Sequence, residues 1–207
     1  MPPRRPKETP AERRERKAAI DDPAVILEAG ARFLEARPRS VAEVRRRLGQ
    51  AGYRSELIEG AIGRLTELGV LDDEQFARQW VESRDRAHPR GEHALIIELR
   101  QKGIDATTIA AILKERREVA VRWEDQPVAE PAAAEDAPEH PDLTAARRLI
   151  ERNRRALDRI PDQRMRLQKA YALLARNGFD PETCRDVATE AARPVGTTGE
   201  ETLRDEG

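Results

Sequence analysis

The chain contains one segment three times, and this repetition constrains the fold more than any other feature of the sequence. The copies are VAEVRRRLGQAGYRSELIEGAIGRL at residues 41–65, EHALIIELRQKGIDATTIAAILKER at 92–116 and LQKAYALLARNGFDPETCRDVATEA at 167–191. Each copy is too short to bury an apolar face alone, which is typical of units that stack on their neighbours. The sequence therefore predicts an array of small helical repeats.

The register of the three copies is set by their central glycines, Gly52, Gly103 and Gly178. A leucine lies four residues before each glycine, and an aromatic or branched apolar residue follows it directly. The position six residues after the glycine is isoleucine in two copies and Cys184 in the third. We therefore expect Cys184 to be a small buried hydrophobic residue.

Composition favours helices and indicates the compartment. Ala, Leu, Arg and Glu are abundant, while only 3% of residues are aromatic and 37% are charged, which predicts thin helical cores and much exposed surface. The expected fold is all-α, an elongated tandem array of three three-helix repeats. The sequence has no apolar run that could span a bilayer, no secretory signal and a single cysteine. These features predict a cytoplasmic protein without membrane contact.

Helix signals and changes in composition predict the limits of the repeats. Asp22 before Pro23 is a typical helix start, Ser40 and Glu43 form a capping box, and Gly52 supplies a left-handed helix end. The predicted organisation is a disordered basic tail at 1–21 (of which 11–20 could extend a helix), repeat 1 at 22–70, repeat 2 at 71–117, an acidic linker at 118–141, repeat 3 at 142–191 and a disordered tail at 192–207.

Charge is strongly segregated, although the net charge is only −1. Residues 118–142 carry eight acids and one arginine, whereas residues 143–189 carry eleven basic residues and six acids. A basic third repeat can meet a polyanion or an acidic protein face. One hypothesis is that the acidic segment folds back on this repeat and competes with its target, and the alternative is a solvated spacer.

The repeats resemble the RecX family of regulators of the bacterial recombinase RecA. The most specific stretch is LDDEQFARQWVESR at 71–84, followed by Arg90-Gly91 and by ELRQKGI at 98–104. Family members show an aspartate, Phe-Ala, an aromatic residue and an arginine, then a glycine and a Glu-Leu-x-x-Lys-Gly-Ile/Val run. The resemblance covers residues 23–116 and, less regularly, 143–190. The third repeat departs from it, because alanines replace larger apolar residues and the acidic insert before it is long.

The resemblance implies a regulatory protein that binds the RecA filament on DNA and reduces filament growth, ATP hydrolysis and strand exchange. It places the protein in recombinational DNA repair and the SOS response. We further expect a monomer with only weak DNA contact. Two alternatives stay open: a helical protein that binds DNA directly, and a helical scaffold for another protein partner.

The candidate partner-binding residues are all arginines. Arginine suits both bidentate recognition of carboxylates and contact with phosphates, so the pattern does not distinguish protein from DNA. A solvated helix face is the alternative interpretation for the run of three that begins at Arg45. The predicted set is Arg45, Arg46, Arg47, Arg84, Arg90, Arg147, Arg148, Arg152, Arg155 and Arg159.

An enzyme is not expected. The sequence has no phosphate-binding Gly-rich loop, no HExxH or CxxC motif and no serine or cysteine nucleophile motif. His88, His93 and His140 lack the spacing of metal ligands. Asp72 and Asp73 are explained by helix capping rather than by a metal. We therefore predict no catalytic residue, no metal and no cofactor.

Overall fold

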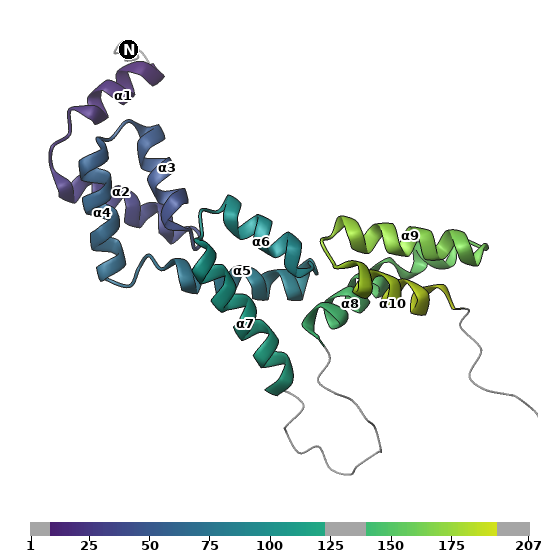
Figure 1. Cartoon of the computed structure of the whole chain (residues 1–207). Coiled ribbons are helices and arrows are strands. Elements are labelled where there is room, and N and C mark those ends of the chain that lie inside the picture. The colour runs from purple at the N-terminus through teal and green to yellow at the C-terminus, as the bar shows by residue number, and fades with distance from the viewer. Residues whose placement is uncertain (1–8, 123–139, 194–207) are drawn as a thin grey trace, which may run out of the picture. The chain divides into compact units, whose positions relative to one another are not determined.

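All regular secondary structure in the described residues is α-helical, which confirms the expected all-α class. The computed structural model describes residues 9–122 and 140–193 (Figure 1). The helices are α1 Pro10–Ala18, α2 Pro23–Glu35, α3 Val41–Ala51, α4 Ser55–Glu67, α5 Asp73–Ala87, α6 Glu92–Gln101, α7 Ala106–Arg122, α8 Pro141–Asp158, α9 Gln163–Arg176 and α10 Pro181–Ala192.

The chain forms two compact units, and the middle helices contribute to both. Among the described residues, the first unit contains 9–83 and 96–116, and the second contains 84–95, 117–122 and 140–193. The helices α5, α6 and α7 therefore each begin in one unit and end in the other.

The predicted helix signals are present at the start and end of α3. The Ser40 side chain accepts a hydrogen bond from the Glu43 N–H at 3.2 Å, and the Glu43 carboxylate accepts one from the Ser40 N–H at 3.4 Å. Gly52 ends the helix with φ of 100°. Asp22 caps α2 by accepting from the Ala24 N–H at 2.9 Å. Local sequence therefore determines these helix limits.

Asp72 and Asp73 are both caps, but of different helices. Asp72 accepts hydrogen bonds from the backbone N–H groups of Glu74 at 2.8 Å and Gln75 at 3.0 Å, at the start of α5. Asp73 instead accepts from the N–H of Val41 at 2.8 Å, at the start of α3. The capping interpretation is correct, and one of the two caps connects repeats 1 and 2.

The core of the first unit lies between α2, α3 and α4. Its buried residues come from the apolar positions that recur at helical spacing, and each large apolar side chain so buried contributes about 1.5–3 kcal/mol of transfer free energy. The buried set is Ile26, Val44, Leu48, Ile58, Ala61, Ile62, Leu65 and Leu71.

Alanine is the commonest residue in the core between α8, α9 and α10. Ala170 and Ala188 are completely buried, and Cys184 is 1% exposed as expected. Small side chains at contact positions allow helix axes to approach closely. The alanines that set the third repeat apart from the other copies are therefore buried in this core with Leu174 and Phe179.

Two helices bear on the predicted limits, and one of these limits needs correction. The helix α1 lies in the part of the basic tail for which the sequence left a helix open, and Thr9 and Glu12 make a capping box at its start. The helix α7 continues to Arg122, so the predicted linker begins inside a helix. Residues 123–139 and 194–207 lie outside the described residues, and with them most of the acidic segment and its fold-back hypothesis.

Candidate protein-binding surface

The three consecutive arginines of α3 have different surroundings, although all are exposed. Arg45 forms a bidentate ion pair with Glu59 of α4, with N–O distances of 2.6 and 2.8 Å. This hydrogen bond raises the pKa of Arg45 and lowers the pKa of Glu59. The Arg47 guanidinium lies 5.7 Å from the Phe33 ring centroid. Arg46 has no hydrogen-bond or ion-pair partner within the described residues.

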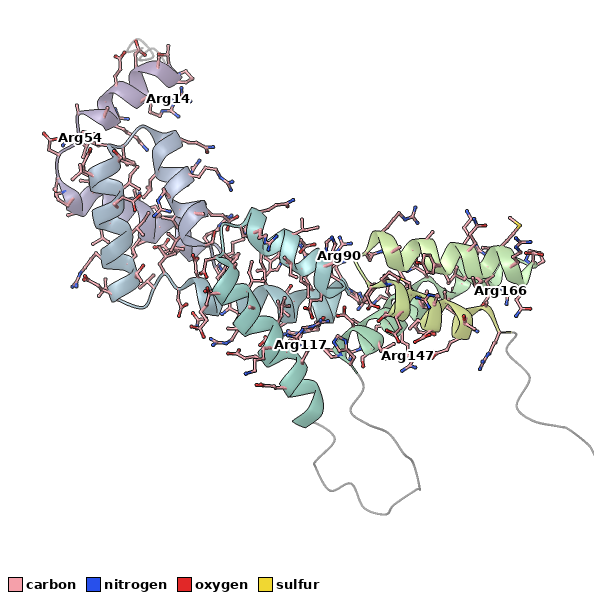
Figure 2. All side chains as sticks on the ribbon, in the orientation of Figure 1. Arg14, Arg54, Arg90, Arg117, Arg147 and Arg166 are labelled. Atoms are coloured by element: carbon pink, nitrogen blue, oxygen red, sulfur yellow. The ribbon has the colours of Figure 1, made fainter. Side chains whose placement is uncertain are left out.

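Two of the predicted arginines of α8 are engaged inside the second unit. Arg147 makes a bidentate ion pair with Glu190 of α10, at 2.9 and 2.8 Å (labelled in Figure 2). Arg152 donates hydrogen bonds to the carbonyl oxygens of Arg86, at 2.8 Å, and Ala87. These carbonyls belong to the last turn of α5, where a cation is favoured by the helix dipole. Both arginines hold elements of the unit together.

The remaining arginines of the predicted stripe, Arg148, Arg155 and Arg159, form an exposed row along α8. At 3.6 residues per turn, their positions fall within about 40° of one another around the helix. None of the three has a hydrogen-bond or ion-pair partner in the parts of the chain that the structure describes. We call these three residues the α8 row. Their guanidinium groups are available to a partner.

The basic residues beyond α8 do not all extend this row. Arg166 is half-buried, and its guanidinium donates to the carbonyl oxygens of Ile160 at 2.9 Å and Ala192 at 3.3 Å (Figure 2). Arg164 and Lys169 of α9 are exposed. Arg166 therefore holds the end of α10 and the turn before α9.

Arg84 and Arg90, which the family-like stretch suggested, are half-buried. The Arg90 guanidinium donates a hydrogen bond to the side-chain carbonyl of Asn177, at the end of α9 (Figure 2). Arg84 also has a partner within the chain. Both residues therefore belong to the second unit, and both are less exposed than the three arginines of the α8 row.

The junction between repeats 1 and 2 is a network of polar contacts in the first unit. Ser40 Oγ donates to the Lys102 carbonyl at 2.6 Å, and Lys102 Nζ donates to Glu43 Oε1 at 2.9 Å. The Lys102 ammonium lies 4.7 Å from the Trp80 ring centroid, and Trp80 Nε1 donates to Glu98 at 2.9 Å. Burial alone would raise the pKa of Glu43, but the Lys102 hydrogen bond and charge outweigh it and the pKa is lowered.

At the junction between repeats 2 and 3, in the second unit, an aspartate again caps a helix of the preceding repeat. Asp142 is 2% exposed and accepts a hydrogen bond from the Glu92 N–H, at the start of α6, at 2.9 Å. Asp73 does the same for Val41 at the start of α3. The Gly91 N–H also donates to the Asn177 carbonyl at 3.0 Å. An acid of the following repeat thus caps the second helix of the preceding one.

Sequence reasoning overlooked a basic cluster around Phe33, at the end of α2. Arg39 lies 4.4 Å from the ring centroid, nearer than Arg47, and Arg37 lies beside Glu43 with an N–O distance of 3.8 Å. The local signal was present, because the Arg-Pro-Arg run directly precedes the Ser40 capping box. The spacing between Arg39 and Arg47 did not suggest that both would contact one ring.

Within residues 9–122 and 140–193, no group of three or more His, Cys, Asp or Glu side chains is arranged to hold a metal ion. None of the described helices combines the length and apolar character needed to cross a bilayer.

Family models match the first two repeats. The model of the first three-helix domain of RecX matches residues 27–65, and the model of the second matches residues 72–113. Together they cover most of α2 to α4, all of α5 and α6, and the first part of α7.

Solved structures support the fold. A crystal structure of RecX from Lactobacillus salivarius superimposes with a TM-score of 0.63 at 18% identity, covering 83% of this chain and 97% of that one. A second structure, of regulatory protein RecX, gives a TM-score of 0.63 at 19% identity, covering 81% of this chain and 73% of that one. At this identity the likeness concerns the fold alone.

Relatives with higher identity extend over most of the chain. The regulatory protein RecX of Mycolicibacterium smegmatis is 33% identical over 159 residues, covering 76% of this chain and 74% of the relative. The regulatory protein RecX of Mycobacterium sp. (strain JLS) is 34% identical over 161 residues, with 76% of each chain covered. This identity over most of both lengths shows that the chain belongs to the RecX family of regulatory proteins.

Proposed function

We propose that this protein binds the filament that RecA forms on DNA and lowers the ATPase and strand-exchange activity of that filament. The protein acts in the cytoplasm by binding, not by catalysis. Family membership supports a regulatory role. The exposed α8 row is the observation that supports direct contact with a protein partner. Three unpaired guanidinium groups on one helix face are suited to the carboxylates of a protein surface.

The spacing of the α8 row suits a repeated target. Arg148 and Arg159 are eleven positions apart in the sequence, which is about 16 Å along an α-helix. Each contact on its own is weak, because exposed ion pairs contribute only about 0–1 kcal/mol. A surface that meets neighbouring subunits of a polymer gains from effective concentration, since the second contact is intramolecular once the first is made.

The variant that best tests this surface leaves the paired arginines of α8 unchanged. Reversing Arg147, Arg148, Arg152 and Arg155 to glutamate would also remove the Glu190 ion pair and the bonds to the last turn of α5. The sharper variant replaces only the α8 row, as Arg148→Gln, Arg155→Gln and Arg159→Gln. A matched control removes the same number of charges from paired residues of the first unit: Arg32→Gln, Arg45→Gln and Arg64→Gln.

The direct test is co-sedimentation of each variant with RecA filaments assembled on single-stranded DNA. We expect the α8-row variant to bind at least tenfold more weakly and the control variant to bind within about twofold of the unaltered protein. Equal binding by the α8-row variant would remove the row from the contact surface. No sedimentation of the unaltered protein would refute the proposal itself and favour a scaffold for another partner.

Direct DNA binding is the second candidate, because the α8 row could also contact phosphates. Three phosphate contacts would make the affinity for duplex DNA fall about forty-fold between 50 and 200 mM salt. Fluorescence anisotropy with a bare oligonucleotide at these two salt concentrations separates the candidates. Our proposal predicts weak binding to bare DNA at both, and tight binding at 50 mM salt with this steep decline would support the DNA-binding alternative.

A further inference from the structure

Two arginine side chains lie against one aromatic ring in the first unit, and a third arginine lies near them. We call Phe33, Arg37, Arg39 and Arg47 the Phe33 cluster. The guanidinium carbons of Arg39 and Arg47 lie 4.4 and 5.7 Å from the ring centroid, within the range of a cation–π contact. Arg37 approaches Glu43 at 3.8 Å and is close enough to Arg39 for its charge to lower the pKa of Arg39.

Local structure explains why these side chains meet. Phe33 lies in the last turn of α2, and the residues 36–40 connect it to α3. The Ser40 capping box fixes the start of α3, so Arg39 is held directly before the helix. Arg47 comes two turns later on α3, on the side that faces Phe33. The cluster is therefore set by helix capping and by the packing of α2 against α3.

The cluster carries positive charge that its surroundings do not balance. Glu43, the acid that approaches Arg37, is 6% exposed and accepts a hydrogen bond from Lys102 at 2.9 Å. Arg39 and Arg47 donate no hydrogen bond to any described residue. Elsewhere in the same unit, arginines pair with carboxylates: Arg32 with Glu28, Arg45 with Glu59, Arg54 with Asp21, Arg64 with Glu67 and Arg78 with Glu115.

Arg39 is the most constrained member of the cluster. Its Nε atom is buried and has no hydrogen-bond partner among the described residues. Burial lowers the pKa of Arg39, and the charge of Arg37 lowers it further. Like charges held together in this way oppose one another, and a buried donor without an acceptor carries a desolvation cost. An anion at the cluster would relieve the repulsion and use the free guanidinium donors.

We propose that the Phe33 cluster is a docking site for an acidic segment of a partner protein, recognised through its carboxylates. The planar donor fork of arginine matches a carboxylate in a bidentate manner, as the Arg45–Glu59 pair in this chain shows. A short acidic segment fits the small size of the cluster.

DNA fits the cluster less well for two reasons. Single-stranded DNA is bound by stacking its bases on open aromatic rings, whereas the Phe33 ring already carries guanidinium groups. A nucleic acid also needs an extended basic track, because its phosphates recur along the whole strand. Residues 21–117 carry 17 basic and 17 acidic residues, so this part of the chain has no net positive charge to form such a track.

The test uses the full chain, labelled with ¹⁵N and titrated with a glutamate-rich decapeptide while arginine Nε–H signals are followed by NMR. A thymidine oligonucleotide of equal charge is the second probe. We expect the peptide to shift the Arg39 and Arg47 signals. The double variant Arg39→Gln with Arg47→Gln should weaken peptide binding at least tenfold. The charge-matched double variant Arg45→Gln with Arg64→Gln should change it less than twofold.

Each contrary result overturns the proposal. It fails if the peptide leaves the arginine signals unchanged, if both double variants lose affinity equally, or if the oligonucleotide binds these arginines more tightly than the peptide. Should the first double variant fold poorly by circular dichroism, the single variant Arg37→Gln decides, because Arg37 is exposed. It should weaken peptide binding several-fold, and unchanged binding refutes the site. The α8 row is tested separately, so either proposal can fail alone.

Discussion

The tight packing of Gly103 against the preceding repeat gives the sharpest prediction about stability. Gly103 ends α6 with φ of +82°, and a Cβ added there would clash with the Cβ of Ala42 at the start of α3. Gly69 has a similar φ of +67°, but a Cβ added there would meet no atom within 4 Å. The substitutions Gly103→Ala and Gly69→Ala therefore share backbone strain and differ in the contact between repeats.

The expected magnitudes follow from these two geometries. Left-handed backbone costs an alanine about 1 kcal/mol, so Gly69→Ala should lower the unfolding free energy by about that amount. Gly103→Ala adds about 2 kcal/mol for overpacking, which gives about 3 kcal/mol in total. With a urea m-value of about 1.5 kcal/mol/M, the unfolding midpoints should fall by about 0.7 M for Gly69→Ala and about 2 M for Gly103→Ala.

The assay is urea unfolding followed by the fluorescence of Trp80, in a Trp123→Phe background that leaves one tryptophan in the chain. Trp80 belongs to the first unit and contacts Lys102, next to Gly103. Its emission therefore reports on the junction between repeats 1 and 2. Equal midpoint shifts for the two glycine variants would contradict this reasoning, because they would show that the clash with Ala42 does not lower the unfolding free energy further.

Three further predictions concern the titratable groups. Because the folded-state pKa of Glu43 is lowered from 4.5, the stability that it contributes should be lost as pH falls below about 4.5, and urea titrations at several pH values should show a smaller loss in Glu43→Gln. Removing the half-exposed Arg147–Glu190 pair by Arg147→Ala should lower the thermal midpoint only slightly, since such pairs contribute about 0–1 kcal/mol; a loss above about 2 kcal/mol would contradict this. Burial raises the pKa of Cys184, so a thiol reagent should label it slowly in the native protein and rapidly in urea; fast native labelling would be inconsistent with its burial.

Signals that act within a few residues could be predicted from the sequence. The capping box at Ser40, the left-handed glycine at Gly52 and the buried position of Cys184 all follow from short patterns, and all are observed. The all-α class follows from the same helical spacing. These features depend on neighbours along the chain, which a single sequence displays.

Contacts between residues far apart in the chain could not be predicted. Asp73 has the sequence setting of a local cap, yet it caps the helix that begins 32 residues earlier. Arg147 and Arg148 are adjacent and look equivalent, but only Arg147 faces an acid of α10. Helix direction and packing decide which arginine of a run is paired, so the sequence indicated a stripe of five arginines where the structure leaves three unpaired.

The central claim, regulation of RecA by direct contact, is tested most directly by the ATPase rate of RecA on single-stranded DNA. The protein should lower this rate in a concentration-dependent manner at micromolar concentrations. The variant with Arg148, Arg155 and Arg159 replaced by glutamine should need at least tenfold more protein for the same effect. An ATPase rate unchanged by the unaltered protein across this range would contradict the account.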